Sequence, residues 1–151
     1  MSNHVEAAVQ KHVEGYNCAQ SVLFAYSAEL GLDPDTALKL ACGLGAGMGR
    51  KGAVCGAVSG GILALGAKYG RGVNEDRPVT IATYAKVREL MDNFQAVYGT
   101  VICRELLNGC DLTTDAGQQS YKDNDLANKV CNPCIARVAQ ILDKMLISIA
   151  R

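Results

Sequence analysis

Apolar residues recur every three or four positions along most of the chain, and no stretch alternates with period two for long enough to predict a strand. The pattern therefore predicts an all-α protein, a single-domain multi-helix bundle over residues 1–151 with glycine-rich connections between helices. The expected helices cover residues 3–14, 18–30, 34–42, 53–69, 78–98, 101–107 and 131–149. Residues 110–130 are polar and turn-rich, and we expect one helical turn there.

The helix boundaries rest on capping signals. The side chains that can accept hydrogen bonds from the first turn of a helix are those of Asn17, Asp33 and Thr100, and Gly15 and Gly99 are typical of helix ends.

Two of the predicted helices are long and have extended apolar faces. In the helix opened by Pro78 the inward residues are predicted to be Val79, Ala82, Val87, Leu90, Met91, Phe94 and Val97, and in the last helix Ile135, Val138, Ile141, Leu142, Met145, Leu146 and Ile149.

Composition excludes several classes of protein. Fifteen Lys and Arg balance fifteen Asp and Glu, whereas nucleic-acid binding and adhesion to anionic membranes favour a basic excess. The longest uncharged stretch, residues 52–67, is shorter than the roughly 18–20 residues that span a bilayer, so we predict a buried helix and no membrane insertion. The N-terminus lacks the pattern of a secretory signal, which predicts a cytoplasmic protein.

Seven cysteines are unusual for a chain expected in a reducing compartment, where structural disulfides are rare. Five of them fall at the predicted starts of four helices, and these five are Cys18, Cys55, Cys103, Cys131 and Cys134. The unpaired N–H groups and dipole at a helix N-terminus stabilise a thiolate, which is both a nucleophile and a metal ligand. Cys42 and Cys110 have no such position and are expected to be small packing residues.

Cys131-Asn132-Pro133-Cys134 is a C-x-x-C motif, typical of a redox pair or of half a metal site. No second C-x-x-C at zinc-ribbon spacing is present, and neither is the cysteine run of ferredoxins. A metal site would therefore be assembled from cysteines that are distant in the sequence.

The glycines have their own spacing. Gly52, Gly56 and Gly60 repeat every four residues, which predicts one edge of the fourth helix that approaches another helix closely or makes room for a bound group beside Cys55. The glycine-rich segment 43–52 matches the phosphate-binding loop poorly, because a helix and not a strand precedes it, and a tight helix connection is favoured. The two histidines, His4 and His12, are expected on the surface.

Together these motifs resemble those of a bacterial and archaeal family of redox-active proteins named C_GCAxxG_C_C. Residues 55–60, Cys-Gly-Ala-Val-Ser-Gly, match its CGAxxG signature. Residues 17–23 resemble the opening motif, residues 47–49 the centre, and Cys103 and Cys131 the last two cysteines. The resemblance implies that Cys18, Cys55, Cys103 and Cys131 act as a set, although Cys134 leaves open which member of the C-x-x-C is the fourth.

The leading hypothesis is a redox or electron-transfer protein in which Cys18, Cys55, Cys103 and Cys131 bind an iron–sulfur cluster, with Gly56 and Gly60 beside the bound group. An alternative is metal-free dithiol–disulfide exchange by Cys131 and Cys134. A third is a non-redox helical module with structural zinc or buried cysteines. The sequence does not identify the redox partner or the substrate, and it leaves enzymatic activity and homo-oligomer formation open.

Overall fold

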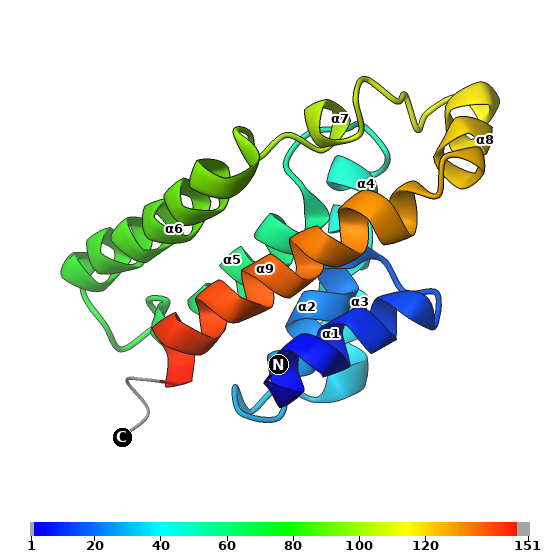
Figure 1. The fold of residues 1–151 in the computed structure, drawn as a ribbon. Helices are drawn as coiled ribbons and strands as arrows, with labels where there is room; N and C mark the ends of the chain where they lie inside the picture. The colour runs from blue at the N-terminus through cyan, green and yellow to red at the C-terminus, as the bar shows by residue number, and fades with distance from the viewer. Residues whose placement is uncertain (1, 148–151) are drawn as a thin grey trace.

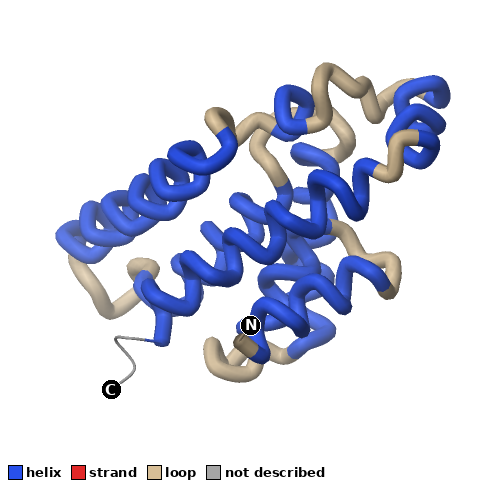
Figure 2. The backbone as a smooth tube through the Cα atoms, viewed as in Figure 1, coloured by secondary structure: helices blue, strands red, loops and turns tan. Residues whose placement is uncertain are grey.

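The computed structural model describes residues 2–147, so the predicted inward residue Ile149 lies outside the described part of the chain. The elements are α1 (Asn3–Val13), α2 (Cys18–Tyr26), α3 (Pro34–Ala41), η1 (Cys42–Leu44), α4 (Gly45–Met48), α5 (Gly56–Tyr69), α6 (Arg77–Tyr98), α7 (Cys103–Leu106), α8 (Asp115–Asp123), η2 (Ala127–Cys131), α9 (Asn132–Leu142) and η3 (Asp143–Ile147). Within residues 2–147 there is no strand, only an isolated antiparallel bridge between Val54 and Ile102. The all-α prediction is confirmed (Figures 1 and 2).

The core lies where α1, α2, α5 and α9 pack together, with α9 crossing the centre of the molecule (Figure 1). Its largest fully buried aliphatic side chains include Leu23, Leu65, Leu90, Ile135 and Leu142. Burial of such side chains contributes about 1.5–3 kcal/mol each. The four helices therefore form a rigid frame for the loops and short helices at one end.

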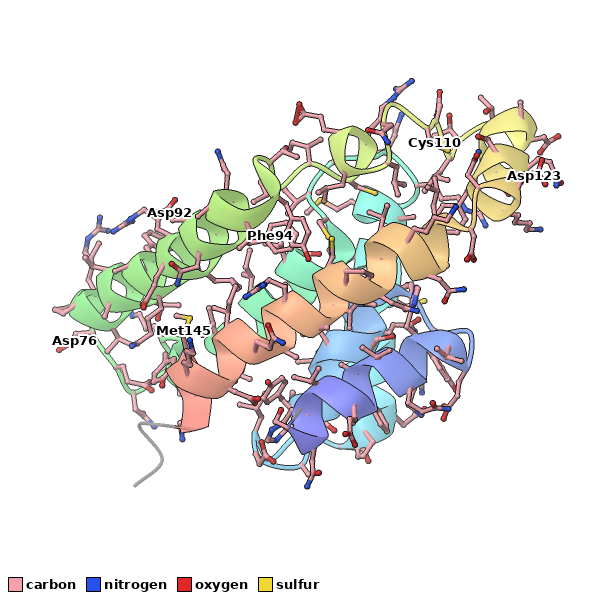
Figure 3. The ribbon with its side chains drawn as sticks, viewed as in Figure 1. Asp76, Asp92, Phe94, Cys110, Asp123 and Met145 are labelled. Atoms are coloured by element: carbon pink, nitrogen blue, oxygen red, sulfur yellow. The ribbon has the colours of Figure 1, made fainter. Side chains whose placement is uncertain are left out.

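Helix α6 packs along only one side, against α5 and α9 (Figure 1). Leu90 and Phe94 are fully buried, and Phe94 lies between α6 and α9 (Figure 3). The predicted inward face was too wide, since Ala82 is exposed and Val97 is 50% exposed. A helix that touches its neighbours along one stripe buries fewer residues than a wholly enclosed helix.

The fourth predicted helix begins later than expected. Helix α5 starts at Gly56 instead of residue 53, because the backbone at residues 53–55 pairs with residues 101–103 and is held extended. Gly52 consequently lies in the preceding loop with a φ of +70°, so it does not share the helix edge with Gly56 and Gly60. The apolar stretch does form a largely buried helix, and no helix within residues 2–147 is both long and apolar enough to cross a bilayer.

Further boundaries differ from the prediction, since α2 ends at Tyr26 instead of residue 30 and α7 begins at Cys103 instead of residue 101. Residues 110–130 contain the nine-residue helix α8, which begins where the side chain of Thr114 accepts a hydrogen bond from Gly117 N. The last helix begins at Ala127 with the π-helical turn η2 and runs into α9 without a break. Pro133 has no N–H to donate to the preceding turn, and the wider π turn lets the helix continue through it.

Candidate functional site

Five thiols line one cavity of about 600 Å³ at the end of the molecule that carries α4, α7 and α8. They are the five that the sequence placed at helix starts, namely Cys18, Cys55, Cys103, Cys131 and Cys134. Figure 3 shows the same end of the molecule, with the labelled Cys110 and Asp123 beside α7 and α8. Cys55, Cys103 and Cys134 are buried, and Cys18 and Cys131 are partly exposed.

Cys18 is the first residue of α2, and its place is set by Asn17. The side chain of Asn17 accepts a hydrogen bond from Gln20 N, and the side chain of Gln20 accepts one from Asn17 N, which forms a capping box. Asn17 Nδ2 also donates to Cys42 O over 2.8 Å. A Cβ at Gly45 would lie 2.2 Å from Asn17 Cγ, so glycine there makes room for the cap.

Cys55 and Cys103 are held side by side through their backbones. Cys55 N donates to Val101 O over 2.8 Å, and Cys103 N donates to Ala53 O over 2.6 Å. Cys55 is the N-cap of α5, and Cys103 is the first residue of α7. A Cβ on Gly47, which has a φ of +67°, would lie 2.7 Å from Cys103 Cβ. The glycine-rich segment thus packs tightly around the thiols, as a helix connection and not as a phosphate loop.

Cys131 and Cys134 do not lie at a free helix N-terminus, contrary to the prediction. Cys131 is the last residue of the π turn η2, and Cys134 is buried in the first turn of α9. The helix dipole therefore gives these two thiols no stabilisation of the thiolate. Instead the π turn fixes how they face the cavity, and π turns inside helices are frequent at functional sites.

The five thiols include two hydrogen-bonded pairs, and each pair joins one member of the C-x-x-C to a different cysteine. The first pair is Cys18 and Cys131. This hydrogen bond is the main reason why the pKa of Cys18 is raised well above its usual value and that of Cys131 is lowered to about 7. Tyr121 supports the Cys131 thiolate, because its hydroxyl lies 3.3 Å from Cys131 Sγ.

The second pair is Cys55 and Cys134. Their hydrogen bond lowers the pKa of Cys55, helped by the backbone N–H groups of Ala57 and Val58 at the start of α5, and raises that of Cys134. Cys103 has no thiol partner, and burial raises its pKa to about 12. Within each pair the pKa of one thiol is thus raised and that of its partner is lowered.

His12 is a site residue that the sequence analysis missed. Its Nδ1 lies 2.6 Å from Asn132 Oδ1, and its Nε2 lies 3.9 Å from Cys18 Sγ. Asn132 Nδ2 donates to Asn128 Oδ1, and Asn128 Nδ2 donates to Asp125 Oδ1. Because an amide oxygen only accepts, His12 Nδ1 must carry the hydrogen, and the Nε2 lone pair faces the thiol.

The spacing of Asp125, Asn128 and Asn132 on one helical face could have indicated this chain of hydrogen bonds. Nothing in the sequence connects that face to His12, which comes from α1. Tyr121 was missed for a similar reason, because α8 was expected to be mostly loop.

The two motif glycines have different surroundings. Gly56 lines the cavity, and a Cβ there would lie 3.0 Å from Cys18 Cβ. A Cβ on Gly60 would lie 2.6 Å from Ala19 O, in the contact between α2 and α5. Gly60 therefore serves helix packing and not the space beside a bound group.

The other two thiols lie outside the cavity lining. Cys42 is exposed, and Cys110 donates from Sγ to Gly117 O over 3.1 Å. Within residues 2–147 no group of three His, Cys, Asp or Glu side chains is arranged to hold a single metal ion. The site is thus a cavity lined by five thiols, of which four form two pairs.

A family model described as "Putative redox-active protein (C_GCAxxG_C_C)" matches residues 16–145. The chain belongs to this family. The match spans all five thiols of the cavity and confirms the resemblance seen in the motifs. No curated protein and no solved structure matches the chain. The redox description of the C_GCAxxG_C_C family agrees with a cavity whose walls are thiols.

Proposed function

We propose that this C_GCAxxG_C_C protein is an electron-transfer protein in which Cys18, Cys55, Cys103 and Cys131 hold an iron–sulfur cluster. The observation that carries the proposal is the meeting of these four thiols, from separate segments, around one cavity. Four thiolates are the ligand set of [2Fe–2S] and [4Fe–4S] clusters, and such a cluster supplies one-electron redox chemistry when bound.

The donor set fits a cluster better than a zinc ion. A structural zinc site requires four donors around one atom, and within residues 2–147 no three His, Cys, Asp or Glu side chains are arranged to hold a single metal ion. A cluster spreads its ligands over several metal atoms. Cys55 and Cys131 have lowered pKa values and are the readiest ligands, while the backbone bridge and the π turn orient the cysteines toward the cavity.

The proposal includes a cytoplasmic location, where thiols stay reduced, and a partner that exchanges electrons at the cavity. We infer no role in nucleic-acid binding, because the chain has no basic excess. Cys134 is the alternative to Cys131 as the fourth ligand, since both line the cavity.

The experiment is anaerobic purification and reconstitution with iron and sulfide, followed by colour, metal and acid-labile sulfide analysis and electron paramagnetic resonance. Wild-type protein and Cys42→Ser should be brown with equal iron and sulfide. Cys18→Ser, Cys55→Ser and Cys103→Ser should lose most of both. Comparison of Cys131→Ser with Cys134→Ser identifies the fourth ligand. Colourless wild-type protein without iron or sulfide contradicts the proposal.

A second candidate function is thiol–disulfide exchange without a metal, and the two hydrogen-bonded thiol pairs favour it. The Cys131 thiolate would attack the disulfide of a partner protein, forming a mixed disulfide and releasing one partner thiolate. Cys18, after losing its proton, would attack Cys131 Sγ, form a Cys18–Cys131 disulfide and release the second partner thiol. The oxidised protein would then show Cys18–Cys131 and not the Cys131–Cys134 pair expected from the motif, and peptide mapping distinguishes them.

A further inference from the structure

The cavity is lined by apolar and charged side chains as well as by thiols. The buried residues of its lining include Cys55, Cys103 and Cys134 together with Leu107 and Leu112. Its rim is exposed and carries Arg50 and Lys122. The volume of about 600 Å³ lies within the roughly 300–1,000 Å³ of pockets that bind small molecules.

The charged side chains that line the cavity are all basic. Arg50 and Lys122 line the cavity, and the described residues that line it include no Asp or Glu. Neither cation has a hydrogen bond or ion pair within residues 2–147. Since the whole chain has equal numbers of basic and acidic residues, this local excess is a property of the cavity and not of the surface in general.

The backbone holds Arg50 at this rim in a costly conformation. Residues 46–50 all have positive φ, and three of them, Ala46, Met48 and Arg50, are not glycine. Left-handed backbone is unfavourable for a residue with a Cβ, and strain of this kind clusters at functional sites. Two of the three strained residues, Ala46 and Arg50, line the cavity.

We propose that the outer part of this cavity binds a small organic anion with an apolar body. Its acidic group pairs with Arg50 and Lys122, and its body lies against the leucines of α7 and the adjoining loop. This site goes beyond the proposed redox function, because its cations and apolar wall are present whether the thiols hold a cluster or form disulfides.

The experiment uses fluorescence titration of the reduced, metal-free full chain with two dyes of similar shape. Anilinonaphthalene sulfonate carries a negative charge, and N-phenylnaphthylamine is uncharged. The double variant Arg50→Gln/Lys122→Gln should bind the sulfonate at least about tenfold more weakly than wild type, as loss of charge-assisted contacts implies, and bind the neutral dye equally well.

The matched control is Lys51→Gln/Lys129→Gln, which removes the same charge from two lysines that do not line the cavity. It should bind both dyes like wild type. Equal weakening of sulfonate binding in the control, or no weakening in Arg50→Gln/Lys122→Gln, overturns the anion site. Loss of neutral-dye binding in Arg50→Gln/Lys122→Gln overturns it too, because the cavity itself would then depend on these residues.

Cluster content separates this inference from the proposed function. Reconstituted Arg50→Gln/Lys122→Gln should hold as much iron and sulfide as wild type while its metal-free form binds the sulfonate weakly. If wild type holds no cluster but shows the charge-dependent dye binding, the anion site stands and the cluster proposal fails.

Discussion

The two histidines of α1 lie eight residues apart, near opposite ends of one helix, and their surroundings differ completely. His4 stacks on the Tyr26 ring at 4.5 Å, with Nε2 2.5 Å from Glu29 Oε1 and Nδ1 3.0 Å from Asp143 Oδ1. His12 has a neutral amide on one nitrogen and the Cys18 thiol on the other, beside an open cavity.

The surroundings of His4 serve the stability of the fold, whereas those of His12 bear on the reactivity of a thiol. At the His4 end the imidazole nitrogens face carboxylates and the aromatic ring fills the space, so the polar groups are satisfied by fixed partners. At the His12 end the amide fixes the tautomer and the remaining lone pair faces a thiol whose proton has two acceptors, His12 and Cys131. Substitutions at the first end should alter stability, and those at the second should alter thiol reactivity.

The largest expected effect lies within the thiol end. In the reduced, metal-free protein at pH 7, iodoacetamide should alkylate Cys131 more than about 100-fold faster than Cys103, since the thiolate is the nucleophile. The pKa of Cys131 is about 7 and that of Cys103 about 12, and the lower nucleophilicity of a low-pKa thiolate offsets only part of this difference. Peptide mass spectrometry over time measures both rates.

The pH dependence gives the control. The Cys131 rate should fall as pH drops below 7, because its thiolate is protonated there, while the Cys103 rate should rise throughout the range from pH 6 to 9. Similar rates for the two thiols would contradict the prediction, because the hydrogen bonds to Cys131 and the burial of Cys103 would then not control reactivity. Exposed Cys42 reports the rate of a thiol outside the cavity.

The second prediction concerns the helix crossing that holds the thiol end in place. Gly60→Ala should destabilise the protein by about 1–3 kcal/mol, because its Cβ would lie 2.6 Å from Ala19 O. Gly66→Ala, in the same helix, should stabilise by about 0.5–1 kcal/mol, because Gly66 is exposed and its Cβ would meet nothing within 4 Å. Thermal melts measure both signs, and a rise for Gly60→Ala would contradict the close contact.

The third prediction tests the His4 end. The Tyr26 hydroxyl is buried and lies 2.7 Å from both Ala139 O and Asp143 Oδ1. Tyr26→Phe removes the one hydroxyl hydrogen, which is donated to either oxygen but not to both at once, and should cost about 1–2 kcal/mol in urea unfolding. Alkylation rates of the cavity thiols should not change. A changed Cys131 rate would show that the two ends are coupled through α2 or α9.

The sequence predicts those features of the fold and of the site that depend on neighbouring residues. Asn17 and the Asp33-Pro34 pair fixed the starts of α2 and α3, because capping is decided by neighbouring residues. The five cavity thiols could be selected by their position at predicted helix starts. That selection was right about where the thiols lie, but the reason given for Cys131 and Cys134 was wrong, because their helix starts four residues earlier than Cys131.

The remaining features depend on contacts between distant segments. The bridge from Val54 to Ile102 delays α5 and sets Cys55 beside Cys103, and no local pattern predicts it. The thiol pairing also joins α2 to η2, so the pKa values of Cys18 and Cys131 reflect the partner thiol more than the helix that carries each. His12 was expected on the surface because the sequence does not show which residue its ring nitrogens face.

The smallest expected effect tests the His12 end directly. Asn132→Ala removes the acceptor for His12 Nδ1, so the ring is free to change tautomer and its lone pair no longer faces Cys18. Alkylation of Cys18 in the reduced, metal-free protein should quicken a few-fold, because each hydrogen bond that the neutral thiol donates raises its pKa and the variant removes one of the two. Stability should change by less than about 1 kcal/mol, since the amide is partly exposed.

The control is Asn128→Ala, which removes the hydrogen bond from Asn132 Nδ2 to Asn128 Oδ1 and leaves the contact between Asn132 and His12 intact. Its effect on Cys18 should therefore be smaller. An equal or larger effect from Asn128→Ala would show that the helix backbone near η2, and not the orientation of His12, controls this thiol.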